Sequence, residues 1–451
     1  MNQRQRIFFW SITAALGGFL FGFDTAVISG VEQSLQSLWK LNVWEHGLTV
    51  SIALIGTVLG SMSGGIPAER LGRKKTLFWI AILYLAASLG TALAPTWGIF
   101  LLFRFLGGLG VGASSVAAPM YITEISPAKS RGKLVGLFQF NVVFGILIAY
   151  LSNFLLADVG VEPWRWMLGV QAFPSLIFLI AVLNIPESPR WLLLNKGQRS
   201  ESRISGDPVE EARKVLNMID PATAEQTLAA IQQSDHYGTA STQLFSATYK
   251  TPIMLAVLFA VFNQVSGINA IIYYAPRIFE MTGLGKSSSL LSSAGIGLIN
   301  LIFTLISMNL IDRYGRRTLM KIGSVGLIVT LGLVARAFYV EDFSGMTVPF
   351  LLFGYIAFFG FSQGAVIWVF ISEIFPNEVR AGGQALGSFT HWLMAAIITF
   401  TFPYLAEHFG GGNTFLFFTV MMVLQLLFVV RLMPETKGTS LEQIERTFVV
   451  H

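Results

Sequence analysis

Long apolar segments constrain this chain more than any other feature of its sequence. A segment of about 20 predominantly apolar residues can cross a bilayer as a helix, because in lipid a backbone has to satisfy its own hydrogen bonds. Charged residues make up only 12% of the 451 residues, about half the share in a soluble domain. The sequence therefore predicts an all-α integral membrane protein with twelve transmembrane helices. Their expected bounds are 7–30, 48–67, 76–95, 97–122, 132–157, 164–185, 252–280, 288–311, 318–339, 348–375, 382–407 and 413–433.

Basic residues gather in alternate loops between these segments. The basic loops carry Arg4 and Arg6, residues 70–75, 129–133 and 313–321, while the intervening loops carry few, such as Lys40 and Lys286. The positive-inside rule then places both termini in the cytoplasm. The first segment lacks a small-residue cleavage site and is expected to be retained. The net charge of +5 is thus a topology signal, and no nucleic-acid partner is expected.

The two halves of the chain repeat each other. "EISPAKSRG" (124–132) resembles "EIFPNEVRA" (373–381), and "AERLGRKK" (68–75) resembles "IDRYGRRT" (311–318). "PESPR" and "PETKG" follow the sixth and the twelfth segment. A near-constant offset of about 245 residues indicates a duplication, a common architecture of secondary transporters that bind substrate between their halves.

A polar stretch separates the halves. Asp-Pro pairs at Asp207 and Asp220 are helix-start signals and predict short cytoplasmic helices there. We therefore expect an N-terminal six-helix bundle at 1–189, a cytoplasmic linker with short helices at 190–250, and a C-terminal six-helix bundle with a short cytoplasmic tail at 251–451.

Polar residues in the middle of the segments predict a binding cavity. Six of them lie roughly 12–18 Å from the nearest helix end, counting about 1.5 Å per residue. Amides at this depth are costly unless they meet partners or water, so they either fasten helices together or line one aqueous cavity. Gly267 suggests a locally broken helix, from which Asn269, Tyr273 and Tyr274 would continue the lining. The six residues are Gln139, Asn263, Gln264, Asn300, His391 and Trp392.

Asp24 is a lone carboxylate inside the first segment. It lies roughly 9 Å below the outer end of its helix, and Arg104 of the fourth segment lies roughly 10 Å below the same face. A single charge in a spanning helix costs at least about 2.5–3.5 kcal/mol, so we expect the two to pair. The pair is either a structural lock between helices or a proton-binding device, because a carboxylate whose distance from an arginine changes can bind and release a proton.

Five separately placed motifs give the sequence a family resemblance. "GGIPAERLGRKK", "DRYGRR", "PESPR", "QVSGINAIIYY" and "PETKG" resemble the signatures of the sugar porter family of the major facilitator superfamily. The resemblance implies two pseudo-symmetric six-helix bundles that carry a monosaccharide by alternating access, without catalysis or cofactor. It also implies proton symport, since coupled members commonly have Asp at the position of Asp24.

The resemblance assigns residues to the sugar site as well. It implies that Gln139, Gln264, Asn269, Asn300, Trp368 and Trp392 bind sugar. Amides suit hydroxyl groups, and the two tryptophans offer flat apolar faces to a sugar ring. Two positions depart from the family pattern: Asn263 stands where Gln is frequent, and His391 where Asn or Gln is usual. These departures leave the identity of the sugar open.

Charges at the cytoplasmic helix ends predict a gate network. They either anchor the helix ends at lipid headgroups or form contacts that differ between the two conformations of the carrier. We expect Glu124 to pair with Arg131, and Glu373 with Arg380. The candidate network comprises Glu69, Arg70, Arg73, Glu124, Arg131, Glu187, Arg190, Asp312, Arg313, Arg316, Glu373, Arg380 and Glu435.

The rival functions have less support. The sequence contains no P-loop, no nucleophile elbow and no histidine pair at metal-ligand spacing, so we expect neither an enzyme nor a metal site. His46, His236, His408 and His451 are expected near helix ends or in loops, exposed to solvent. A sugar uniporter is the nearest alternative. A sugar sensor needs a signalling tail, for which the residues after Gly438 leave little room, and an organic-ion antiporter fits the neutral cavity poorly. The expected partners are a monosaccharide, a proton and the lipid bilayer of a bacterial inner membrane, and the protein is expected to act as a monomer.

Overall fold

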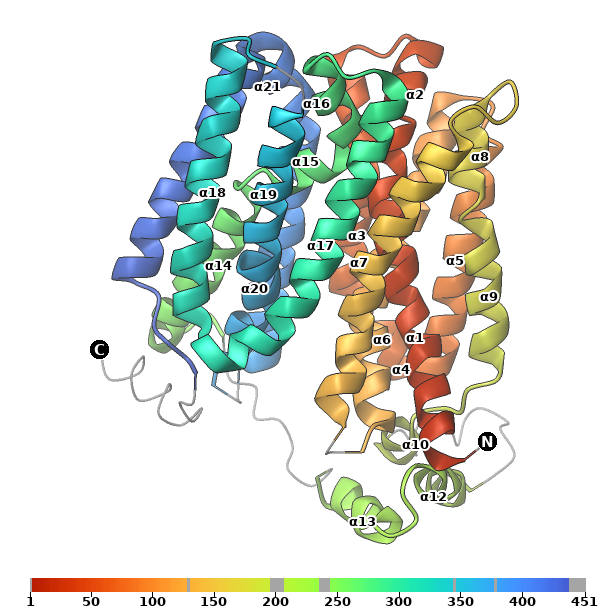
Figure 1. Cartoon of the computed structure of the whole chain (residues 1–451). Helices are drawn as coiled ribbons and strands as arrows, with labels where there is room; N and C mark the ends of the chain where they lie inside the picture. Colours follow the sequence, from red (N-terminus) through yellow and green to blue (C-terminus); the bar gives the residue numbers. More distant parts are fainter. Residues whose placement is uncertain are drawn as a thin grey trace. The chain divides into compact units, whose positions relative to one another are not determined.

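The computed structural model describes residues 2–127, 130–194, 207–234, 244–343, 346–376 and 379–437. Its contacts divide the chain into two compact units (Figure 1). Unit 1 comprises Met1–Asp24, Gly56–Gly145 and Leu168–Ala240, and unit 2 comprises Thr25–Ile55, Ile146–Met167 and Ser241–His451. The division into halves at 1–189, 190–250 and 251–451 follows from the internal repeat and stays a prediction.

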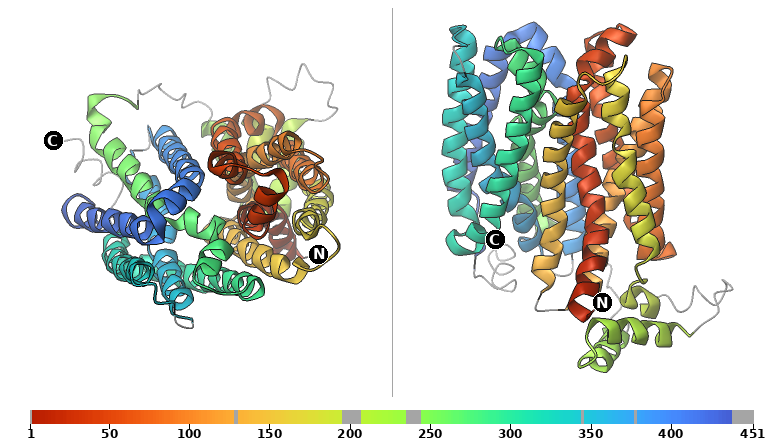
Figure 2. Two further views of the ribbon diagram at one scale, coloured as in Figure 1. Left: turned by 90° about the horizontal axis from the view of Figure 1, so that it is seen from above. Right: turned by 45° about the vertical axis from the view of Figure 1, so that its right-hand side comes forward.

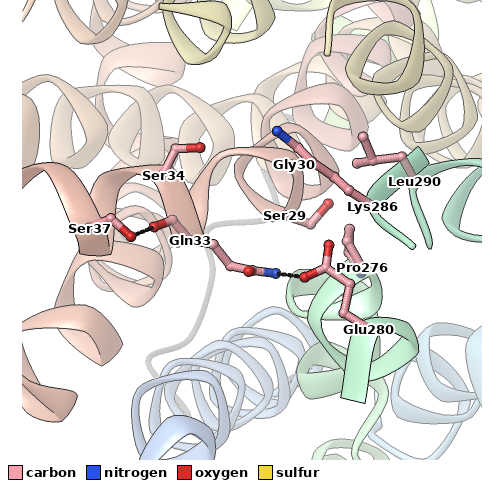
Figure 3. Close-up of a pocket in the computed structure, with 9 residues that line it drawn as sticks. All are labelled: Ser29, Gly30, Gln33, Ser34, Ser37, Pro276, Glu280, Lys286 and Leu290. Carbon is pink, nitrogen blue, oxygen red and sulfur yellow. Dashed lines mark hydrogen bonds between the residues drawn. The ribbon is translucent and has the colours of Figure 1, made fainter. Parts of the chain in front are cut away.

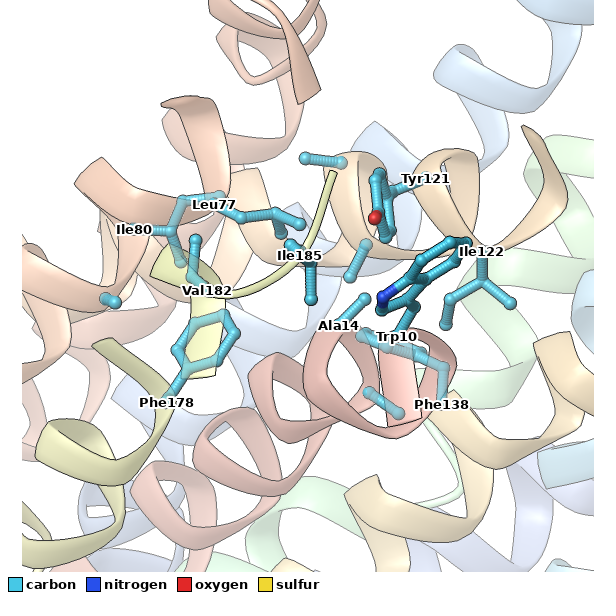
Figure 4. Packing of buried hydrophobic residues seen from close by; sticks show 14 of the residues in the cluster. Trp10, Ala14, Leu77, Ile80, Tyr121, Ile122, Phe138, Phe178, Val182 and Ile185 are labelled. Carbon is cyan, nitrogen blue, oxygen red and sulfur yellow. The ribbon is translucent and has the colours of Figure 1, made fainter. Parts of the chain in front are cut away.

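Unit 1 is built from long apolar helices. Its helices pack around a core to which α1 contributes Trp10 and Ala14, α6 Tyr121, and α9 Phe178 (Figure 4). The side chain of each of these residues is at most 4% exposed, so this apolar surface is held between helices. The helices are α1 (Gln3–Val27), α3 (Val43–Ser63), α4 (Gly65–Leu71), α5 (Arg73–Ala92), α6 (Trp97–Ile125), α7 (Arg131–Leu156) and α9 (Ala172–Leu183). Unit 1 contains α1 only up to Asp24, α3 only from Gly56 and α7 only up to Gly145.

Three short helices follow α9 in the same unit. They are α10 (Pro189–Leu194), α12 (Pro208–Ile219) and α13 (Ala224–Ser234), and they lie at the same end as the amino terminus (Figure 2). The Asp207 side chain caps α12 by accepting from Val209 N at 3.0 Å, as its Asp-Pro pair predicts. The prediction that a second helix starts at Asp220 is wrong in its first residue, because Asp220 is the C-cap of α12 and α13 begins only at Ala224.

Unit 2 contains the remaining helices. They include η1 (Ile28–Gly30), α2 (Glu32–Trp39), the first part of α3, the last part of α7, α8 (Pro163–Gly169, to Met167), η2 (Ala247–Tyr249), α14 (Lys250–Gln264), α15 (Ile268–Tyr273), α16 (Ala275–Met281), α17 (Lys286–Tyr314), α18 (Arg316–Tyr339), α19 (Thr347–Phe361), α20 (Gln363–Glu373) and α21 (Arg380–Arg431).

Three helices of unit 2 are broken inside their apolar segments. Gly267 has φ +85° between α14 and α15, and a Cβ added there would lie 2.6 Å from the Phe418 ring. The break predicted at Gly267 is thus confirmed. A second break, at Ser362 between α19 and α20, was not expected within 348–375. A third lies inside α21, where Gly410 has non-helical φ and ψ of 75° and 165°.

The break at Gly410 explains why the structure has one spanning helix fewer than the twelve segments expected from the sequence. Among the described residues, 11 helices are long and apolar enough to span a membrane. The last of them, Gly382–Arg431, contains both segments expected at 382–407 and 413–433, and Gly410 lies between the two. The prediction of an all-α chain with twelve spans is therefore confirmed.

Candidate substrate and proton sites

Four polar side chains of unit 2 form one hydrogen-bonded cluster around Gln264. Gln264 Nε2 donates to Asn263 Oδ1 at 2.8 Å and lies 3.2 and 3.3 Å from the two ring nitrogens of His391. Gln264 Oε1 accepts from Asn269 Nδ2 at 2.7 Å. The break at Gly267 lets the chain turn, so that Asn269 reaches back to Gln264. We call these four residues the amide cluster.

The amide cluster lies against aromatic rings. The His391 ring centroid is 4.8 Å from that of Trp368 on α20 and 4.8 Å from that of Trp392. All four members of the cluster are at most 9% exposed, whereas Trp368 is 37% exposed. The cluster therefore joins satisfied amides to an open indole face, a combination that fits a polyol with an apolar ring face.

Three other predicted site residues are not members of the amide cluster. Asn300, on α17, is 8% exposed, and its Oδ1 accepts from Thr304 at 3.4 Å. Tyr273 ends α15 and is 2% exposed. Gln139 lies on α7 in unit 1 and is half-buried.

Gln363 is a candidate site residue that was not predicted from the sequence. It begins α20 directly after the break at Ser362 and is fully buried. Its backbone oxygen accepts from Asn263 Nδ2 at 3.5 Å, and its side-chain Oε1 is buried without a hydrogen-bond partner within the described structure. An unsatisfied buried acceptor next to the amide cluster is available to a ligand. The signal was present in the sequence as a polar residue beside Gly364 within an apolar segment.

Asp24 and Arg104 are in contact within unit 1. Arg104 Nη1 lies 2.6 Å from Asp24 Oδ1, and the two side chains are 2% and 7% exposed. Arg104 Nη2 also donates to the backbone oxygen of Asp24 at 3.4 Å. The pairing expected from equal depth is thus present, and its role in proton binding stays a proposal.

An arginine of unit 1 organises a network at the start of α5. Arg73 binds both carboxylate oxygens of Glu124 at 2.9 Å. Glu187 Oε1 accepts from the backbone N–H groups of Arg73 at 2.8 Å and Lys74 at 3.1 Å. Burial raises the pKa of the Glu187 carboxyl, against the lowering effect of these backbone hydrogen bonds. Gly72, at φ +99°, would place a Cβ 2.3 Å from Glu187 Oε2, so only glycine fits there.

Unit 2 repeats this network with the second copy of the motif. Arg316 binds the two oxygens of Glu373 at 2.8 and 3.2 Å, and Glu435 Oε1 accepts from Arg316 N at 2.9 Å. Gly315, at φ +86°, would place a Cβ 2.5 Å from Glu435 Oε2. Arg316 also pairs with Asp312 at 3.0 Å. The internal repeat of the sequence thus recurs as a repeated set of contacts.

The predicted pairings within the Glu-to-Arg motifs are wrong. Both oxygens of Glu124 are taken by Arg73 rather than Arg131, and both oxygens of Glu373 by Arg316 rather than Arg380. A bidentate arginine–carboxylate pair is the stronger arrangement. Arg380 instead donates to a backbone oxygen at 3.2 Å. Among the other predicted members, the following side chains are exposed: Glu69, Arg70, Arg131, Arg190, Asp312 and Arg313.

The prediction of a solvated His46 is also wrong. His46 lies near the start of α3, as expected, but it is 0% exposed and its Nε2 is 2.7 Å from a carboxylate oxygen of Glu32. His408 is exposed and stacks on Tyr404 at 4.0 Å between ring centroids. His236 and His451 lie outside the described residues.

Comparison with known proteins identifies the family. The family model described as "Sugar (and other) transporter" matches residues 10–448. The chain belongs to the sugar transporter family. It is 37% identical to the arabinose-proton symporter of Bacillus subtilis, over 97% of this chain and 94% of the relative. It is 34% identical to the glucose transporter GlcP of Staphylococcus epidermidis, over 96% and 95%.

A solved structure of the family supports the same conclusion. The inward open conformation of the xylose transporter XylE from E. coli matches with a TM-score of 0.86 and 33% identity, over 98% of this chain and 100% of that chain. This member of the sugar transporter family is therefore a multi-pass membrane protein with the major facilitator fold.

Proposed function

We propose that the protein imports a monosaccharide, a pentose or a hexose, by alternating access coupled to the symport of protons. Relatives of similar length are named for arabinose, glucose and xylose, and the arabinose relative is named a proton symporter. The observation that carries the proposal is the combination of the amide cluster with the buried Asp24–Arg104 pair. Sugar and proton cross unchanged, so no covalent step and no cofactor is needed, and the protein is not an enzyme.

The amide cluster binds the sugar in this proposal. Gln264 already uses its amide nitrogen and its carbonyl oxygen within the protein. A sugar hydroxyl that replaces one partner keeps Gln264 satisfied, and a second hydroxyl has to satisfy the partner that is displaced. Asn269, Asn300 and Gln363 offer further amide groups, and Trp368 covers the apolar face of the ring. Tyr273 completes the proposed set in unit 2, and Gln139 of unit 1 stays a predicted sugar-binding residue.

Asp24 carries the proton. When Arg104 lies 2.6 Å away, the guanidinium stabilises the carboxylate and opposes protonation. A conformation that separates the two leaves a buried carboxylate, which favours the protonated form. A cycle that alternates between these states moves a proton with the sugar.

The two arginine networks act as gate contacts at the cytoplasmic ends of the helices. A contact can bias a conformational equilibrium only if it differs between the two states. Bidentate pairs such as Arg73–Glu124 and Arg316–Glu373 meet this condition when the helix ends separate. The proposal further places both termini in the cytoplasm, the spans in the lipid of a bacterial inner membrane, and the function in a monomer.

Reconstitution into proteoliposomes tests the proposed function. Hexoses, pentoses and inositol compete against radiolabelled glucose, and a pH dye inside the vesicles records proton entry on sugar addition. Sugar uptake with a matching proton signal is expected. Sugar uptake without a proton signal would establish a uniporter, and failure of every sugar to compete would refute the assignment.

A further inference from the structure

A second buried acid–base group lies in unit 2, and its first member follows Asp24 by eight residues along the chain. Glu32 of α2 and His46 of α3 are both 0% exposed, and Glu32 Oε2 is 2.7 Å from His46 Nε2. The other carboxylate oxygen, Oε1, is 3.2 Å from Arg277 Nε on α16. We call Glu32 and His46 the outer dyad, because the proposed topology places α2 and the start of α3 on the outer side.

The outer dyad has unused hydrogen-bonding capacity. Both oxygens of Glu32 and both ring nitrogens of His46 are buried without a hydrogen bond of good geometry within the described structure, despite their short contacts. Buried polar groups are normally satisfied, and each exception requires a reason. Two titratable groups that face each other in this way can hold one proton between them.

We propose that the outer dyad is a second proton-binding site, whose loading from outside releases α16 from α2 and α3. Without the extra proton, the dyad carries one negative charge that attracts Arg277. With it, the dyad is neutral, whether the proton is on the imidazole or on the carboxylate. The attraction to Arg277 falls in both cases, and in a buried setting such a change is large.

The elements around the outer dyad supply few other charges. On α16, Glu280 accepts from Gln33 Nε2 at 2.9 Å, and Arg277 also donates to the Gln36 side chain. The ring centroid of Tyr274 is 6.0 Å from that of His46, and the Tyr274 hydroxyl donates to the backbone oxygen of Thr399. The titratable and charged side chains in this region are Lys40 after α2, Glu45 on α3, Tyr274 before α16, Arg277 and Glu280 on α16, Lys286 on α17, and Tyr404 and His408 on α21, where Tyr404 stacks on Trp44 of α3 and on His408.

A pocket is lined by Gln33, the neighbour of Glu32 in sequence, and in this proposal protons reach the outer dyad through it. It has a volume of about 330 Å³, and its lining includes Ser29, Gln33, Glu280 and Lys286 (Figure 3). Gln33 and Glu280 meet in its wall and connect α2 to α16. These contacts join a segment from the first half of the sequence to a helix from the second half, so outward opening under alternating access has to break them. The inference rests on the proposed function in this respect.

The absence of cysteine from the chain allows a direct test. A single Ser29→Cys substitution places a thiol in the pocket wall at a position that is only 2% exposed. Val161→Cys, at a fully exposed position (100%), corrects for the pH dependence of the thiol itself. The ratio of their labelling rates with a membrane-impermeant maleimide is measured in proteoliposomes at external pH 8 and pH 6 without sugar.

We expect the ratio to rise roughly fivefold or more on acidification, the lower end of typical coupling between two sites. His46→Gln should abolish the rise. Glu32→Gln, which imitates the neutral dyad, should give the high ratio at both pH values. Glu45→Gln, which neutralises an acid one residue away on the same helix, should behave like the parent.

The outcomes separate this inference from the proposed function. A flat ratio in the parent, or an unchanged rise in well-folded His46→Gln and Glu32→Gln, overturns the outer dyad as a proton site even if sugar-driven proton uptake is intact. A pH-dependent ratio that requires His46, in a protein that fails to transport any sugar with protons, would retain the site and refute the symport.

Discussion

Replacing Asp24 by asparagine separates the structural role of the Asp24–Arg104 pair from its role in coupling. Arg104 Nη1 lies 2.6 Å from Asp24 Oδ1 in a fully buried setting. Removing one partner of such a pair costs about 3–5 kcal/mol when the remaining charge is left unpaired. Asparagine leaves Arg104 without its counter-charge but keeps an oxygen acceptor at the same position, so the expected loss lies at the lower end of this range, about 3 kcal/mol. The variant should therefore be destabilised but still fold.

The transport phenotype should be more severe than the loss of stability. A pH difference of one unit supplies about 1.4 kcal/mol per proton, which drives about tenfold accumulation of sugar for each coupled proton. Asparagine cannot bind and release a proton, so accumulation by Asp24→Asn should not exceed equilibration. Sugar binding and exchange without a gradient should persist, because the amide cluster lies in unit 2 and is unaltered.

Uptake of labelled sugar into proteoliposomes with an imposed pH gradient measures this, together with counterflow in the absence of a gradient. Glu162→Gln, which neutralises an exposed carboxylate paired with Arg165, is the matched control and should accumulate sugar like the parent. If a well-folded Asp24→Asn protein accumulates sugar on a proton gradient, the coupling role is refuted and the pair is only a structural lock.

Three further outcomes are expected. Gln264→Ala should weaken sugar binding at least about tenfold, the equivalent of about 1.4 kcal/mol, in equilibrium binding; normal affinity with a lower melting temperature would make the amide only a helix fastener. His391→Asn should change the order of sugar preference in the competition panel, because the ring nitrogens that contact Gln264 are replaced by an amide; an unchanged order contradicts a binding role. Burial raises the pKa of Glu187 above its ordinary value of 4.5, so its contribution to stability is greatest below pH 4.5 and is lost as the pH rises through the raised pKa. Thermal unfolding of Glu187→Gln against pH should lack this component, and identical profiles for parent and variant would exclude it.

Much of the fold was predictable because each helix satisfies its own backbone in lipid. Segment length therefore gave the spans, and equal depth along two helices gave the meeting of Asp24 with Arg104. The break at Gly267 was predictable because a glycine between polar residues marks an interruption in an apolar helix. These features depend on one segment, or on two segments of known direction.

Features that depend on packing between segments were not predictable. Glu32 and His46 both lie near helix ends, where solvent is the default, and only the fold buries them at 2.7 Å. The break at Ser362 depends on packing with another helix, because Gly323 of α18 faces it so closely that a Cβ would lie 2.0 Å from Ser362 Oγ. Glu124 pairs with Arg73 and not with Arg131 of its own motif. The spacing of a motif does not show which arginine can bind both carboxylate oxygens.

The duplicated motifs and the candidate sites differ in one respect that bears on mechanism. Each unit keeps a copy of the same arginine network, around Arg73 in unit 1 and Arg316 in unit 2, so the contacts at the helix ends were preserved. The buried acid–base pair of Asp24 with Arg104 belongs to unit 1, and the amide cluster belongs to unit 2. A proton on Asp24 therefore changes the charge that Arg104 meets, while the hydrogen bonds of the amide cluster keep their own donors and acceptors.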